Sequence, residues 1–365
     1  MLIAAASGRA LAASAARAGY VPLVADAFGD QDTLAACGGH ARVDLTKRKV
    51  DGEALLDALD RLAGGRDCLG IVCGTGFESR ADLLARLAQR WRLLGNDAQA
   101  VARIKDPIEF ATLCRAADVP HPETSLVPPA GPAGWLLKRI GGAGGWHIRA
   151  AVRAKARKGA YFQRRAPGEP VSALFLGDGR NIMVLGFSAQ WTAPLPRHPF
   201  RYGGAMRPAA LYGVTTQAMI AALARLNAAL PLTGLNSADF LVNGGAFQLL
   251  EINPRPGATF DLFEPEGDPL FALHLAACAG ALPAQAPRYE DAMAGAIVYA
   301  ERDIDAVPAL AWPDWACDRP VAGSGIEANQ PLCSVFARAA NAAEVRAAVD
   351  RRSATIHALI RERAS

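Results

Sequence analysis

The sequence predicts a mixed α/β protein, and three patterns lead to this fold class. From Leu2 to Arg90, short apolar strands alternate with amphipathic helices. Further on, an apolar strand ends in Lys138 and is followed at once by a glycine-rich run. Far downstream, two apolar segments flank Asn243-Gly244-Gly245 and carry acidic side chains. Alternating order predicts a parallel sheet in the first part, and the late hairpin adds antiparallel strands.

The first 97 residues are expected to form a parallel-sheet domain. Its first strand is not followed by Gly-x-Gly-x-x-Gly, which argues against a nicotinamide dehydrogenase. The alanine-rich start resembles a signal peptide, but it lacks a basic n-region and is interrupted by Arg9 and Arg17. The predicted strands are Leu2–Ala6, Val21–Ala25, Ala41–Asp44 and Leu69–Cys73, and the predicted helices are Arg9–Ala18, Gly52–Ala63 and Ala81–Arg90.

A loop after the Leu69–Cys73 strand is a candidate for substrate contact. Gly74-Thr75-Gly76-Phe77-Glu78 follows the strand directly, and ligands of open α/β sheets bind at the carboxyl ends of strands. Glu78 is therefore a candidate substrate residue, and a plain connecting loop is the alternative.

The rest of the chain is predicted to hold longer helices and a β-rich end. A helix is expected over Asn96–Ala116, because Pro120 and Pro122 stop it, and Thr215–Leu226 has the spacing of a core helix. The C-terminal residues 286–365 are expected to form a small β-rich cap. Its predicted strands are Ala296–Ala300 and Leu332–Ala337, separated by prolines and closed by helix Ala343–Glu362.

The glycine run after Lys138 has two possible interpretations. Lys138 ends the strand Trp135–Leu137, and Gly141, Gly142, Gly144 and Gly145 follow it. A Walker loop is excluded because the lysine precedes the glycines and no Gly-Lys-Ser/Thr follows them. The run is either a surface turn or a flexible cover over nucleotide phosphates.

The downstream hairpin carries the strongest chemical signal. Glu251 and Asn253 are two apart in a strand, so they point to one face about 7 Å apart. Oxygen ligands placed in this way suit Mg²⁺ that is shared with substrate phosphates. A three-residue loop would set Asp239 opposite Leu249 and make Glu251 its diagonal neighbour. A two-residue loop would put Asp239 on the other face as a solvated strand carboxylate.

Lysine is rare in this chain, which draws attention to two positions. Of 39 basic residues only six are lysines, and four of these lie in the pairs Lys47/Lys49 and Lys155/Lys158. The other two are Lys105 and Lys138. Lysine is a compact point charge that arginine does not replace at every phosphate site. The alternative is that these two lysines remain by chance in an arginine-rich chain.

Composition narrows the function class further. The net charge is only +4 and basic residues do not alternate with aromatics over long stretches, so nucleic acid is not an expected partner. Seven cysteines without a Cys-x-x-Cys pair indicate reduced thiols in a cytoplasmic protein. No apolar run is long enough to span a membrane. One basic patch is either a solvated face or an anion-binding surface: Arg149, Arg153, Lys155, Arg157, Lys158, Arg164 and Arg165.

These motifs together resemble the ATP-grasp superfamily. Lys105, in Ile104-Lys105-Asp106-Pro107, is similar to the first ATP lysine of that family and Lys138 to the second. The segment Gln163–Glu169 resembles the hinge that holds adenine, with Glu169 at the ribose position. This hinge departs from the family pattern at Arg164, Arg165 and Ala166, where an acidic residue and large apolar residues are usual. The cofactor-binding residues implied are Lys105, Lys138, Gly141, Gly142, Gly144, Gly145, Gln163, Arg165, Ala166 and Glu169.

The resemblance implies a fold and an activity. The fold would comprise a Rossmann-like domain (1–97), an ATP-grasp domain (98–285) and the β-rich cap (286–365). ATP and Mg²⁺ would be the cofactors, with the metal on Asp239, Glu251 and Asn253. Arg255 and Lys138 would be catalytic in a carboxylate–amine ligase that forms an acyl phosphate and releases ADP and phosphate.

The resemblance extends less specifically to tyramine–glutamate ligases of methanofuran-type one-carbon cofactor biosynthesis. This rests on Cys114 to Thr124 and on the proline- and tryptophan-rich tail. Small carboxylate and amine substrates would contact Arg201, Tyr202 and Arg207, unless these residues form a turn with surface arginines. A homodimer is a further possibility. The alternatives are a glutamate ligase acting on a pterin cofactor, a non-catalytic nucleotide-binding protein and a structural subunit of a larger complex.

Overall fold

The computed structural model describes residues 1–45, 51–152, 155 and 157–363. Its N-terminal part is a parallel sheet in the order β3-β2-β1-β4, which confirms the predicted parallel topology. The strands are β1 Leu2–Ala4, β2 Leu23–Asp26, β3 Gly39–Arg42 and β4 Ile71–Cys73. The helices are α1 Arg9–Arg17, α2 Gln31–Ala36, α3 Gly52–Ala63 and α4 Ala81–Arg90. The sequence did not predict α2, and β3 begins two residues earlier than expected.

The predicted helix over Asn96–Ala116 is in fact two helices, α5 (Ala98–Lys105) and α6 (Pro107–Ala116). The carboxylate of Asp106 accepts hydrogen bonds from the backbone N–H groups of Ile108 and Glu109, and Pro107 takes the first helical position. A proline there starts a helix and disfavours helical geometry in the preceding residue. The break leaves Lys105 at the C-terminal end of α5.

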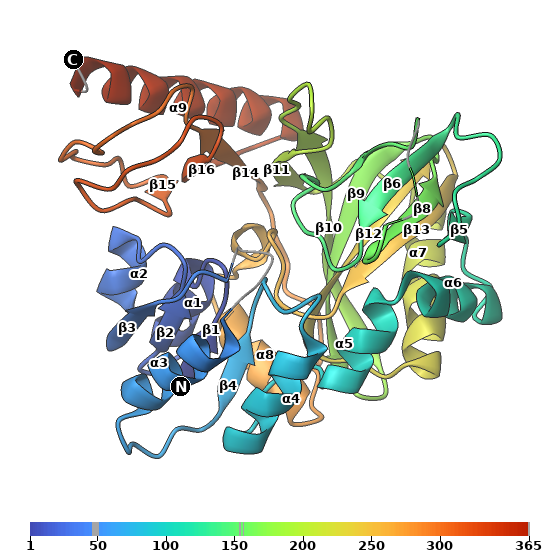
Figure 1. Ribbon diagram of the computed structural model, residues 1–365, viewed down its shortest axis with the longest axis horizontal. Coiled ribbons are helices and arrows are strands. Elements are labelled where there is room, and N and C mark those ends of the chain that lie inside the picture. The colour runs from blue at the N-terminus through green and yellow to red at the C-terminus, as the bar shows by residue number, and fades with distance from the viewer. Residues whose placement is uncertain (46–50, 153–154, 156, 364–365) are drawn as a thin grey trace.

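A large antiparallel sheet of eight strands forms the centre of the molecule, in the order β13-β12-β9-β10-β11-β14-β16-β15. The predicted C-terminal strands extend this sheet rather than forming one of their own, because β14 pairs with β11. In Figure 1, α9 (Ala342–Arg363) covers this end and α7 (Gly213–Ala229) lies behind the other end. The strands are β9 Glu169–Asp178, β10 Ile182–Thr192, β11 Tyr202–Arg207, β12 Thr233–Asn243, β13 Ala246–Asn253, β14 Ala292–Tyr299, β15 Ala316–Cys317 and β16 Pro331–Ala339.

A smaller antiparallel sheet, which we call the lid sheet, carries the glycine run. Its order is β5-β8-β6-β7, with β5 Thr124–Ser125, β6 Trp135–Arg139, β7 Arg149–Ala150 and β8 Ala160–Arg164. Lys138 pairs with Tyr161 and Leu136 pairs with Gln163, so these side chains share one face. The other face buries Trp135, Leu137 and Phe162 with Ala151. Lys138 therefore projects away from the small core of the lid sheet.

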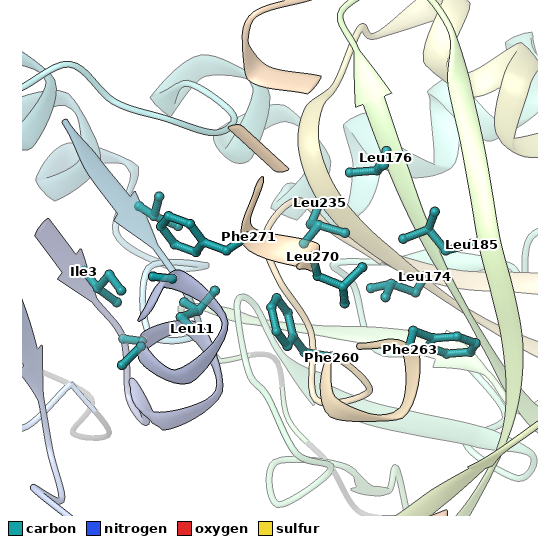
Figure 2. Packing of buried hydrophobic residues seen from close by; sticks show 14 of the residues in the cluster. Ile3, Leu11, Leu174, Leu176, Leu185, Leu235, Phe260, Phe263, Leu270 and Phe271 are labelled. Carbon is teal, nitrogen blue, oxygen red and sulfur yellow. The ribbon is translucent and has the colours of Figure 1, made fainter. Parts of the chain in front are cut away.

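The N-terminal layer is joined to the central sheet by one apolar cluster, drawn in Figure 2. Ile3 and Leu11 come from the N-terminal layer, and Leu174 and Leu185 come from the central sheet. Phe271, on helix α8 (Leu270–Cys278), lies between them. The two layers therefore share one close-packed core. None of the helices in the described ranges has the length and apolar character needed to cross a bilayer.

Candidate active site

The β12–β13 hairpin brings the predicted metal ligands together by a route that the sequence did not predict. Asn243 pairs with Ala246, so the loop has two residues rather than the expected three. A register irregularity between Asp239 and Phe240 then adds one residue to β13. A β-bulge shifts the following side chains by one position, which returns them to the opposite face. As a result, Asp239 pairs directly with Glu251 instead of Leu249.

The oxygen atoms of this shelf are linked by hydrogen bonds. Asn253 donates from Nδ2 to Oδ2 of Asp239 at 3.1 Å, which turns its own amide oxygen away from that carboxylate. Lys105 donates from Nζ to this Oδ1 of Asn253 at 2.7 Å, and it lies 3.3 Å from Oε2 of Glu251. We call Asp239, Glu251 and Asn253 the oxygen shelf. Its three oxygen-bearing groups thus form one connected set with the Lys105 ammonium.

The oxygen shelf fits a hard divalent cation that also binds phosphate. Carboxylate and amide oxygens are the ligands that Mg²⁺ prefers. Two of the three groups already contact a cation, the ammonium of Lys105. Within the described ranges, no cluster of three His, Cys, Asp or Glu side chains is arranged to hold a metal. Octahedral Mg²⁺ takes more oxygens than the two carboxylates and one amide of this shelf, so substrate oxygens or water would complete its coordination.

Lys138 faces the shelf from the lid sheet. It is 5 % exposed, and its Nζ donates to Oε1 of Gln163 at 2.7 Å. Burial lowers the pKa of Lys138, while the charges of Glu251 and Asp239 oppose this shift. Two lysines therefore converge on the two carboxylates of the shelf. The remaining hinge residues lie further along the chain: Arg165 and Glu169 are exposed and Ala166 is half-buried.

The electrostatics of the shelf separate its two carboxylates. Burial raises the pKa of Asp239 above its ordinary value, and the charge of Glu251 raises it further. Burial also acts to raise the pKa of Glu251, but Lys105 and Lys138 outweigh it and hold that pKa well below its ordinary value. Glu251 is therefore the more firmly ionised member of the pair.

The glycine loop, residues 141–145, is packed closely against two other segments. Gly141 and Gly145 have φ of +64° and +74°, and a Cβ at Gly145 would overlap the carbonyl of Phe200. The carbonyl of Gly144 accepts a hydrogen bond from the backbone N–H of Tyr202 at 3.0 Å. A Cβ at Gly141 would meet the backbone of Ser79, so the loop also touches the N-terminal part. These contacts require glycine where the backbone conformation is left-handed or crowded.

Arg255, directly after the hairpin, is held by Glu78. Its Nε and Nη2 lie 2.8 and 2.7 Å from Oε1 of Glu78, and the carboxylate is almost fully buried. The other oxygen of Glu78 accepts a hydrogen bond from the backbone N–H of Gly76. Burial acts to raise the pKa of Glu78, but the charges of Arg255 and Lys105 keep it below its ordinary value. The structure thus joins two predicted site residues that are far apart in sequence.

The three other predicted substrate residues lie in different surroundings. Arg207 is 2 % exposed and donates to the carbonyl of Leu262 and to Asp291. Arg201 donates to the carbonyls of Ala193 and Asn329 and stacks on Tyr299 at 3.7 Å. Tyr202 is half-buried at the start of β11. The guanidinium contacts of both arginines are therefore largely within the protein.

Sequence reasoning missed several side chains around the shelf. Burial lowers the pKa of His147 to about 4, with the charge of Glu251 opposing, so the imidazole is neutral near pH 7. Tyr161 pairs with Lys138 in the lid sheet, and the charge of Glu251 adds to burial in raising its pKa. Trp146 packs against His198 with tilted rings whose centres are 4.9 Å apart. The adjacent glycine run was the one signal that pointed to Trp146 and His147.

A cavity of about 460 Å³ lies where α1, the segment after Arg255 and strands β14–β16 meet. Pockets of this size hold small ligands. It is lined by Arg17, Asp261, Glu264, Pro265, Glu266, Met293, Asp314, Trp315, Cys317, Phe336 and Arg338.

The predicted basic patch is exposed at Arg149, Lys155, Arg157, Lys158, Arg164 and Arg165. Arg153 of that patch, and Lys47 and Lys49, lie outside the described residues.

Comparison with known proteins shows what the fold is similar to. Residues 105–259 match the family model of the ATP-grasp domain. Biotin carboxylase from Campylobacter jejuni has a TM-score of 0.73 at 16 % identity, over 95 % of this chain and 89 % of that chain. L-amino acid ligase from Bacillus licheniformis gives 0.71 at 15 % identity, covering 96 % of both chains. N5-carboxyaminoimidazole ribonucleotide synthetase from Thermus thermophilus gives 0.70 at 17 % identity, over 99 % of this chain and 98 % of that chain. At these identities the likeness concerns the fold.

Proposed function

We propose, from the match of residues 105–259 to the family model of the ATP-grasp domain, that the protein is an ATP-dependent ligase that joins a carboxylate to an amine. The observation that carries the proposal is the convergence of Lys105 and Lys138 on the oxygen shelf. Phosphoryl transfer requires positioning and charge neutralisation more than covalent catalysis. Two ammonium groups beside a metal-binding set of oxygens supply both.

In this proposal the triphosphate of ATP lies between the lid sheet and the hairpin. Lys105 and Lys138 hold the α- and β-phosphates, and the glycine loop covers them. Gln163, Arg165, Ala166 and Glu169 line the nucleoside end, as the hinge resemblance suggests. Mg²⁺ on the oxygen shelf would neutralise charge on the transferring phosphoryl group.

Arg255 is the proposed catalytic residue at the far end of the triphosphate. Its Nε–H donor and one Nη2–H donor are directed at Glu78, and Nη1 donates to the carbonyl of Pro256. A guanidinium has five N–H donors, so two remain for a substrate carboxylate or a transferred phosphate. The carboxylate would attack the γ-phosphate to give an acyl phosphate, and the amine would then displace phosphate.

The products of ATP test this function. ATP, Mg²⁺ and a panel of carboxylates would be incubated with hydroxylamine in place of the amine. The expected result is ADP together with a trapped hydroxamate, because the acyl phosphate is the first electrophile formed. AMP and pyrophosphate as the stoichiometric products would refute the proposal, because they form when the carboxylate attacks the α-phosphate of ATP and pyrophosphate leaves. No nucleotide turnover with any carboxylate, despite tight ATP binding, would favour a non-catalytic nucleotide-binding protein.

A finer proposal is that glutamate is activated and an aromatic amine such as tyramine accepts it. The observation in favour is the 460 Å³ cavity, where Asp314 lies in the same lining as Trp315 and Phe336. The other two carboxylates of the lining, Asp261 and Glu264, are paired with Arg9 and Arg17. Carboxylates attract an ammonium group and aromatic rings pack against an apolar body. Trp315→Ala should raise KM for an aromatic amine while leaving KM for ATP unchanged. Equal effects on aliphatic and aromatic amines would contradict this choice of acceptor.

A further inference from the structure

The Lys105 side chain lies at the oxygen shelf itself. Lys105 Nζ is 2.7 Å from Oδ1 of Asn253 and 3.3 Å from Oε2 of Glu251. Both contacted atoms belong to the group proposed to bind Mg²⁺. The Lys105 side chain is 6 % exposed, so the ammonium is directed into the protein at this point and not into solvent.

This position makes the lysine and the metal competitors for the same oxygen. The amide of Asn253 is fixed, because its Nδ2 donates to Asp239 and only its oxygen remains available to a cation. A divalent ion on that oxygen would lie next to the ammonium, and two cations at such a distance repel each other strongly. Bare metal is therefore disfavoured while Lys105 keeps its two contacts.

The charge count around the shelf leads to the same conclusion. The shelf contains two acidic side chains, Asp239 and Glu251, and two basic side chains lie around it, Lys105 and Lys138. A bare divalent cation would add its charge to a group that is already balanced. A nucleotide triphosphate brings several negative charges, which draw the ammonium of Lys105 toward the phosphates and release the Asn253 oxygen.

We infer that Lys105 is a gate for the metal: it excludes a free divalent cation from the oxygen shelf, and nucleotide binding opens the site. The inference rests on the proposed function, since it concerns the same oxygens. It goes further because it assigns Lys105 a second role, the exclusion of free metal, in addition to binding phosphate. It also predicts that the metal binds only together with nucleotide.

Mn²⁺ binding to the full chain tests this inference, because the electron paramagnetic resonance signal of free Mn²⁺ is lost on binding. Mn²⁺ accepts the same oxygen ligands as Mg²⁺. Wild-type protein should leave the free Mn²⁺ signal unchanged without nucleotide. With a non-hydrolysable ATP analogue it should lower the signal further than the analogue does in a sample without protein. Lys105→Met should bind Mn²⁺ without nucleotide, with affinity at least about tenfold above that of the wild type. Lys105→Gln, which keeps a polar side chain, serves as a second variant in case the methionine disturbs folding.

Lys138→Met is the matched control, because Lys138 is equally buried but donates to Gln163 instead of the shelf. It should weaken binding of the analogue and leave Mn²⁺ binding without nucleotide low. An equal gain of Mn²⁺ affinity in the Lys105 and Lys138 variants would overturn the gate, because net charge alone would then explain it. Nucleotide-independent Mn²⁺ binding by wild type would overturn it as well. If wild type binds Mn²⁺ neither with nor without the analogue, the metal site of the proposed function fails instead.

Discussion

The guanidinium of Arg255 and the carboxylate of Glu78 form a buried ion pair in which Nε and Nη2 share one oxygen, at 2.8 and 2.7 Å. Glu78 follows β4 of the N-terminal sheet, whereas Arg255 follows β13 of the central sheet. The N-terminal part therefore sets the direction of a side chain that lies within the residues matching the ATP-grasp domain model. Truncation of one partner of such a pair leaves a buried charge uncompensated.

Glu78→Gln should lower kcat by about 10- to 100-fold, because a charge-assisted hydrogen bond contributes about 1.5–3 kcal/mol. KM for ATP should change little, since Glu78 contacts Arg255 and not the proposed phosphate lysines. Steady-state kinetics with both substrates would measure the two effects. Glu53→Gln is the control, because Glu53 pairs with Arg86 at the surface. A variant that alters KM for ATP but not kcat would contradict a role for Glu78 in holding Arg255.

Glu251→Gln should abolish turnover while the fold stays intact. The substitution keeps the volume but removes the carboxylate that is most firmly ionised on the oxygen shelf. Loss of a metal ligand should lower kcat by at least about 100-fold, or about 2.7 kcal/mol of barrier. ADP formation would be measured beside a thermal unfolding curve. Turnover within about threefold of wild type would remove Glu251 from the proposed metal site.

The sequence predicted the residues of the shelf better than their geometry. The spacing of Glu251 and Asn253 fixes a common face from local strand geometry alone. The two-residue loop alone would place Asp239 on the face opposite Glu251, and the bulge brings it back to the same face. The alternation of apolar and polar residues along a strand does not reveal a bulge. The parallel N-terminal sheet follows from alternating strands and helices. The pairing of β14 with β11 joins distant segments and leaves no local signal.

Two side-chain contacts in the site were also not predicted from the sequence. Glu78 and Arg255 were each singled out in the sequence, but their pairing joins two layers of the fold. Lys105, which contacts Asn253, directly precedes the helix break at Asp106, and the prediction of one continuous helix missed this break. Residue types carry the chemistry, whereas tertiary packing decides which groups meet.

Arg201 is expected to hold the glycine loop closed. Its guanidinium lies 3.7 Å from the ring centre of Tyr299 and 5.4 Å from that of Trp146, which directly follows the loop. His198 Nδ1 lies 2.7 Å from the carbonyl oxygen of Trp146. Arg201→Ala should therefore speed amide exchange in residues 140–149 by about tenfold, the scale of one or two cation–π contacts.

Hydrogen-exchange mass spectrometry would measure this opening, and KM for ATP should rise in parallel. Arg180→Ala is a suitable control, because Arg180 is exposed in the turn between β9 and β10. If Arg201 binds substrate instead, the variant would raise KM for the carboxylate or amine and leave exchange in the glycine loop unchanged.

Asp30 should make stability fall as the pH rises. It occupies the N-cap position of α2, where its side chain makes no capping hydrogen bond, and it is 6 % exposed. Burial raises its pKa to about 8, with Asp318, Asp26 and Asp32 adding to the shift. Between the ordinary value of 3.8 and about 8, the folded chain keeps a proton that the unfolded chain releases. Stability is lost over this window because the folded state binds more protons. Asp30→Asn copies the neutral form and also favours a helix N-cap.

Asp30→Asn should therefore raise Tm relative to wild type at pH 8, and the difference should shrink as the pH falls toward 4. Thermal unfolding of both proteins across this range would measure it. Asp57→Asn removes the same charge from the exposed face of α3 and should show no such trend. A constant difference in Tm at every pH would mean that the cap, rather than the buried ionisation, separates the two proteins. Only a difference that widens with pH over the predicted window supports a carboxyl that stays protonated in the folded state.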